Sequence, residues 1–180
     1  MSPNAWIEID DDGALIATDG ETQLKKWTYS DFEEYVGECI TPSMYQFMVE
    51  YVYDNIDKDT LRELECDDYD GRFDEQAVEA YFELPWQERL KLHQQTQANL
   101  EAEHRRFTEK IHACDEMPPF DPSSPIYVEC CQFLADLKAK TRAKLERLER
   151  EIHEEGCWRG GWEEGESDTE NQLYDPMDEQ

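Results

Sequence analysis

Residues 117–125 read MPPFDPSSP and divide the second half of the chain into two long segments. Four prolines within nine residues cannot continue a helix, because proline lacks the backbone N–H and its ring clashes with the preceding turn. The segments on either side have apolar residues at helical spacing. The sequence therefore predicts two helices joined by a short loop, which should pack antiparallel as a helical hairpin.

The two predicted helices have facing stripes of the coiled-coil kind. In the first, seam positions recur from Trp86 to Ile111 in alternating steps of four and three. The second runs from about Ile126 to Glu155, and Gly156 is well placed to end it. Its facing stripe comprises Cys131, Leu134, Lys138, Thr141, Leu145, Leu148 and Ile152. The same seam could also join two copies of the chain, so a homodimer through the hairpin is one possibility.

The first half of the chain opens with signals for a small sheet. Two apolar runs, AWIEI at 5–9 and ALIAT at 14–18, are joined across DDDG, which predicts a β-hairpin. The sequence LKKW at 24–27 offers a third strand.

Helix-start signals follow the predicted sheet. Capping boxes are expected at residues 30–33 and 60–63, and Thr41-Pro42 supplies a cap with a first-turn proline. Asp74 is expected to cap a helix through EQAVEAYFEL, which Pro85 interrupts.

These signals divide the chain into three parts. Residues 1–84 form an acidic α+β head, residues 85–157 the long helical hairpin, and residues 158–180 a tail rich in glycine and acidic residues that we expect to be flexible. The predicted fold class is α+β, mainly α, with a small N-terminal β-hairpin or sheet, short helices, the antiparallel helical hairpin and the acidic tail.

The charge is large and unevenly distributed. The chain has 45 acidic and 17 basic residues, a net charge of −28. The head holds 23 acidic and 5 basic residues, the hairpin 14 and 11, and the tail 8 and 1. Such a charge argues against direct binding of nucleic acid or of an anionic membrane, and a basic protein is the natural complement.

Several classes of protein are disfavoured. No stretch approaches the 18 apolar residues of a membrane span, and the first residues lack the basic and apolar regions of a signal peptide. Six cysteines without an export signal favour reduced thiols in the cytoplasm. The chain has no nucleophile elbow, phosphate-binding loop, dinucleotide fingerprint or metalloprotease motif, so we expect neither an enzyme nor a cofactor.

Metal sites are minor alternatives. Residues 8–19 and 66–77 match an EF-hand loop in part, but both fail at anchoring positions, so Asp- and Gly-rich turns explain them. An antiparallel hairpin would bring the end of its first helix near the start of its second. Four zinc ligands could meet there: His112, Cys114, Cys130 and Cys131.

The most unusual stretch is residues 63–84, ELECDDYDGRFDEQAVEAYFEL, in which nine carboxylates are opposed by one arginine. One exposed carboxylate per helical turn spaces charge at ~5.4 Å, whereas duplex DNA carries one charge per ~1.7 Å. Several acidic elements side by side are therefore needed to imitate DNA. The proposed contact residues are Asp67, Asp68, Asp70, Asp74, Glu75, Glu79, Glu33, Glu34 and Glu38.

In size, acidity and lack of catalytic motifs, the chain resembles the anti-restriction and anti-CRISPR proteins of phages and mobile elements. The likeness is one of composition and transfers no residues. It implies an acidic inhibitor, a DNA mimic that blocks a nucleic-acid-handling defence enzyme. The alternatives are an immunity protein that neutralises a basic nuclease toxin, and a coiled-coil adaptor whose charge is incidental.

Overall fold

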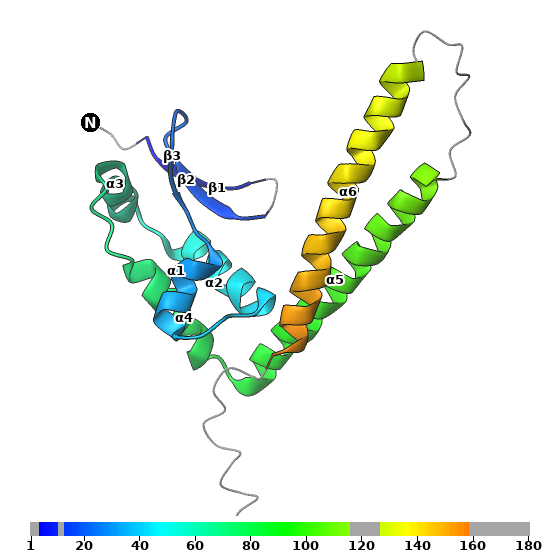
Figure 1. Cartoon of the computed structure of the whole chain (residues 1–180). Helices are drawn as coiled ribbons and strands as arrows, with labels where there is room; N and C mark the ends of the chain where they lie inside the picture. Colours follow the sequence, from blue (N-terminus) through cyan, green and yellow to red (C-terminus); the bar gives the residue numbers. More distant parts are fainter. Residues whose placement is uncertain (1–3, 11–12, 116–126, 159–180) are drawn as a thin grey trace, which may run out of the picture.

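The computed structural model describes residues 4–10, 13–115 and 127–158. These residues form two arms that diverge from a common base (Figure 1). One arm is a head in which a three-stranded sheet is followed by four helices, and the other is a helical hairpin. The predicted class, α+β and mainly α, is confirmed, while the predicted tail beyond Trp158 lies outside the described residues.

The predicted sheet is present, including its third strand. Strands β1 (Trp6–Ile9), β2 (Leu15–Thr18) and β3 (Gln23–Lys26) are antiparallel in the order β1-β2-β3. The central strand is the most buried, because its side chains Leu15 and Ala17 face the core with no exposed surface.

Four helices complete the head: α1 (Tyr29–Val36), α2 (Pro42–Asn55), α3 (Lys58–Cys66) and α4 (Arg72–Glu83). The start predicted for α2 is confirmed, since Thr41 is its N-cap and accepts a hydrogen bond from the Met44 N–H.

The other predicted helix starts differ from the observed ones, and aspartates set two of the observed starts. Helix α1 begins before the predicted box, because Asp31 accepts the backbone N–H of Thr28 at 2.6 Å. Helix α3 begins at Asp57, whose carboxylate accepts the N–H of Thr60 at 2.8 Å. Helix α4 begins after Gly71, so Asp74 lies within its first turn and does not cap it.

The core of the head surrounds Trp27, which has no exposed surface. Phe32 of α1, Met48 of α2 and Tyr81 of α4 are equally buried in the same cluster. Burial of large side chains of this kind contributes roughly 1.5–3 kcal/mol each. This core fixes α1 and α4 against each other, which matters for the charged residues on their outer surfaces.

The second arm is the predicted hairpin, made of α5 (Trp86–Asp115) and α6 (Tyr127–Gly156). The seam is confirmed in its central part, where Leu100 and Leu148 are buried. The two helices are staggered. This is seen in the ion pair at 2.5 Å between Lys138 of α6 and Asp115, the last residue of α5. The first turns of α6 therefore extend beyond α5, and Cys131 is exposed where the seam pattern places it inside.

A buried carboxylate joins the two arms. Glu155, near the end of α6, has no exposed surface and accepts the backbone N–H of Ser43 at the start of α2. Its other oxygen lies 2.7 Å from Nδ1 of His93 on α5. The indole of Trp158 stacks on His93 and on Trp86, with ring centroids 4.4 and 4.9 Å apart.

In the described ranges, none of the helices combines the length and the apolar character needed to cross a lipid bilayer.

Candidate acidic interface

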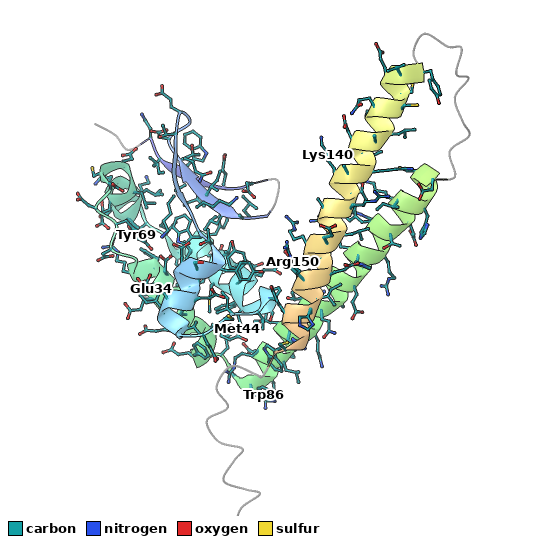
Figure 2. The ribbon with its side chains drawn as sticks, viewed as in Figure 1. Glu34, Met44, Tyr69, Trp86, Lys140 and Arg150 are labelled. Atoms are coloured by element: carbon teal, nitrogen blue, oxygen red, sulfur yellow. The ribbon has the colours of Figure 1, made fainter. Side chains whose placement is uncertain are left out.

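Seven of the nine predicted contact residues are exposed on α1, on α4 and on the segments that adjoin these helices. Helices α1 and α4 pack against each other, and the segment between α3 and α4 lies at the start of α4. We call the following seven exposed residues the acidic face: Glu34, Glu38, Asp67, Asp68, Asp70, Glu75 and Glu79. Glu33 does not belong to it: this side chain is half-buried, accepts the N–H of Ile40 at 3.2 Å and lines a cleft with Arg147 and Arg150 of the hairpin. Glu34 lies on the side of the head turned away from the hairpin (Figure 2).

The segment between α3 and α4 is held by backbone conformations that few residues adopt. Asp67 ends α3 with φ 62°, and Gly71 precedes α4 with φ 82°. Aspartate tolerates this left-handed region better than most residues, and glycine adopts it freely. The Asp70 carboxylate accepts the N–H of Arg72 at 3.1 Å. The acidic residues of this segment therefore have defined positions on the surface.

Tyr35 marks the place where α1, the 67–71 segment and α4 meet. A Cβ atom added to Gly71 would clash with the Tyr35 hydroxyl, so the phenol lies directly against this turn. The pKa of Tyr35 is raised, first by partial desolvation and then by the negative charges of Asp74, Glu34, Glu75 and Asp70. Carboxylates from all three elements thus lie close enough to act on one phenol. The aromatic spacing of the sequence gave no indication of this role.

Asp74, the ninth predicted contact residue, does not belong to the surface. It is 2% exposed, and its carboxylate accepts the indole N–H of Trp27 at 2.5 Å. Lys25 lies 3.0 Å from its other oxygen, and the ammonium also lies over the rings of Trp27 and Tyr69. Burial raises the pKa of Asp74, an effect that Lys25 opposes. The expectation is corrected: Asp74 ties α4 to the sheet inside the head.

The acidic face has no basic partner among the described residues. None of the ion pairs found there, with a nitrogen to oxygen distance of up to 4.0 Å, involves one of its seven carboxylates. The nearest arginine in sequence, Arg72, is held by Glu63 at 2.9 Å and by the hydroxyl of Thr60. The charge of this surface is therefore available to a partner from outside.

The zinc alternative is not supported by the geometry. Within the described ranges, no three His, Cys, Asp or Glu side chains are placed to hold a metal ion. The stagger of the hairpin gives the reason, because Lys138 pairs with Asp115 at the end of α5, so Cys130 and Cys131 lie further along α6, beyond that end. The EF-hand-like segments also have other roles, since Asp10 binds Lys26 and Asp74 binds Lys25.

Comparisons with protein families, with curated proteins and with solved structures found no match to this chain.

Proposed function

We propose that the chain is an acidic inhibitor whose acidic face occupies a cationic, nucleic-acid-binding surface of another protein. The observation that carries this proposal is the meeting of carboxylates from α1, the 67–71 segment and α4 around Tyr35, without a basic partner in the described residues. The proposed role is that of a binding protein acting in the cytoplasm, with no catalytic step.

The arrangement supports the imitation of a nucleic acid, which needs several acidic elements side by side. One acidic helix carries too little charge per unit length, so neighbouring elements must share a surface. Helices α1 and α4 do this, because they pack together over the core around Trp27. A cleft that binds phosphates through lysine and arginine would meet fixed carboxylates there, and a partner of this charge is steered to the face over long distances.

The class of partner follows from the charge and from the compositional likeness described above. A nuclease complex of a phage-defence system has the required basic cleft, and DNA bound in that cleft would compete with the acidic face. The interaction should weaken steeply with salt, because its attraction is between exposed charges.

The test uses two variants of equal net charge. The face variant carries Glu34→Gln, Asp68→Asn, Glu75→Gln and Glu79→Gln, all at exposed positions of the acidic face. The control variant carries Glu21→Gln, Asp54→Asn, Glu88→Gln and Glu101→Gln, exposed positions outside it. Each protein is immobilised and exposed to lysate from cells with active restriction and CRISPR systems, and the retained proteins are identified.

We expect a nucleic-acid-binding protein to be retained by the wild type and by the control variant, released by duplex DNA, and lost from the face variant. Equal retention by the face variant would refute the proposal. Protection against only one nuclease toxin would instead indicate an immunity protein. Retention that persists in the face variant but fails when Leu100 or Leu148 is made polar would indicate an adaptor that works through its hairpin.

A further inference from the structure

The central part of the hairpin is positively charged, in contrast to the rest of the chain. Residues 103–112 of α5 and 138–147 of α6 lie opposite each other, as the 3.2 Å pair between Glu103 and Lys144 shows. Together they contain eight lysines and arginines and three glutamates. A chain of net charge −28 gains no solubility from such a region, so its cations call for another explanation.

Three of these cations gather around Phe107, and two more lie near them on α6. The ring lies 5.1 Å from the charged groups of Arg106 and Lys110 and 5.8 Å from that of Lys144. Lys140 lies one turn from Lys144 on α6, on the side turned towards the head (Figure 2). We call the following residues the basic patch: Arg106, Lys110, Lys140, Lys144 and Arg147.

The basic patch borders an open cleft between the two arms. This cleft of about 570 Å³ is lined by Lys144 and Arg147 on the hairpin and by Tyr29 and Tyr45 on the head. Glu103 and Glu151 on the hairpin and Glu50 and Lys26 on the head also line it. The two tyrosine rings are stacked, with centroids 4.0 Å apart. An extended chain that followed the hairpin wall would therefore have an open path beside the patch.

Internal ion pairs neutralise only part of the basic patch. Lys144 pairs with Glu103, and Arg147 lies 3.6 Å from Glu151. Arg106, Lys110 and Lys140 have no carboxylate oxygen within 4.0 Å in the described part of the chain. The patch therefore keeps a net positive charge.

We propose that the basic patch binds the acidic C-terminal segment of the same chain, residues 159–180. That segment has eight acidic residues and one basic residue. The head, with its excess of carboxylates, repels it, whereas the patch attracts it. Because the segment is covalently attached, the contact is intramolecular and needs only modest intrinsic affinity.

The distances along the chain fit this contact. The segment follows Trp158, which stacks on His93 at the base of the hairpin. From Glu155 to Lys144 the helix rises by about 16 Å. The acids at positions 163–168 follow Trp158 by five to ten residues, a reach of up to ~16–33 Å in an extended chain. The first acidic cluster can therefore lie against the patch, where it would shield the hairpin from other anions. This inference does not depend on which protein the acidic face binds.

The first experiment is zero-length carbodiimide cross-linking of the full chain, with the linked lysine–carboxylate pairs identified by mass spectrometry. We expect Lys110, Lys140 and Lys144 to link to residues 163–168, and the exposed Lys58 and Lys91 to serve as internal controls. High salt should reduce these links several-fold, because it screens exposed charges. Links spread equally over the control lysines would overturn the proposal. So would links that form between isotope-labelled and unlabelled copies, because they would indicate a second chain.

The second experiment measures heparin binding by full-length variants of equal net charge. A tail variant carries Glu163→Gln, Glu164→Gln, Glu166→Gln and Asp168→Asn. Its control is the variant neutralised at Glu21, Asp54, Glu88 and Glu101. We expect the tail variant to bind heparin several-fold more strongly than the control, because the patch is uncovered. A further variant that also carries Lys110→Gln and Lys140→Gln should lose this gain. Equal heparin binding by the tail variant and the control would contradict the proposal.

Discussion

The carboxylate of Glu155 accepts the backbone N–H of Ser43 at 2.8 Å, although 112 residues separate the two in the sequence. Ser43 lies in the first turn of α2, where backbone N–H groups lack partners within the helix and the helix dipole favours a negative charge. The same carboxylate also contacts His93 of α5. One side chain of α6 thus connects the head to both helices of the hairpin.

Replacing Glu155 should loosen the junction between the arms. Glu155→Ala leaves the buried Ser43 N–H and His93 without their acceptor, and removing one partner of a buried charged network costs about 3–5 kcal/mol. Glu154→Ala, at an exposed neighbouring position, should change stability by less than about 0.5 kcal/mol. Urea unfolding followed by tryptophan fluorescence measures both. Similar midpoints for the two variants would show that the junction does not depend on this carboxylate.

The turn beneath the acidic face can be tested with two glycines of similar backbone conformation. Gly37 and Gly71 have φ angles of 80° and 82°, so alanine at either position meets the same left-handed strain of about 1 kcal/mol. A Cβ at Gly37 has open space, whereas at Gly71 it would meet the Tyr35 hydroxyl. Gly71→Ala should therefore be more destabilising in urea unfolding than Gly37→Ala, by the cost of displacing the end of the Tyr35 side chain.

The background of Tyr35→Phe tests the cause of that difference. Removing the hydroxyl takes away the atom that the new methyl group meets, so the extra cost of Gly71→Ala should shrink. If the cost is unchanged in this background, the contact between Tyr35 and the turn does not explain it.

The buried pair of Lys25 and Asp74 provides a test with a defined pH dependence. Lys25→Met leaves the Asp74 carboxylate buried without its counter-charge, which should cost about 3–5 kcal/mol at pH 7. Lys25→Met combined with Asp74→Asn removes the uncompensated charge and should recover much of the loss. Chemical unfolding of the two single variants and the double variant gives the coupling between the residues.

The sign of the pH effect follows from the raised pKa of Asp74. A carboxyl whose pKa is higher in the folded state contributes stability below its unfolded pKa, and that contribution is lost as the pH rises through the folded pKa. Lowering the pH from 7 towards 5 should thus recover part of the loss in Lys25→Met, and less in the double variant. A loss in Lys25→Met that grows on acidification would contradict this account.

The parts of the fold that were predictable depend on local signals. The prolines at 117–125 separate α5 from α6, and the spacing of Leu100 and Leu148 within their helices identifies the seam. Thr41-Pro42 identifies the start of α2, because a cap and its helix are neighbours in sequence.

The parts that were missed depend on distant partners. Asp74 has the same sequence surroundings as the exposed acids near it, and only its contacts with Lys25 and Trp27, 49 and 47 residues away, show that it is buried. Glu155 likewise resembles the exposed Glu154. The stagger of the hairpin depends on the packing of two helices and not on either alone, which is why the proposed zinc ligands do not meet.

The loss of stability at high pH should depend on buried tyrosines, and Tyr45 provides the test. Burial raises the pKa of Tyr45 to about 12, with a further contribution from the charges of Asp10 and Asp31, and its hydroxyl donates to the Trp27 carbonyl at 2.8 Å. A raised pKa in the folded state means that the contribution of Tyr45 is complete below the unfolded pKa of about 10 and is lost as the pH rises towards 12. The phenylalanine of Tyr45→Phe cannot ionise, so the free energy of unfolding of this variant should fall less between pH 10 and 12 than that of the wild type. Tyr53→Phe, at an exposed position, serves as the control. Phenolate absorbance and urea midpoints recorded over this range measure both effects, and identical pH profiles for Tyr45→Phe and the wild type would rule out this role.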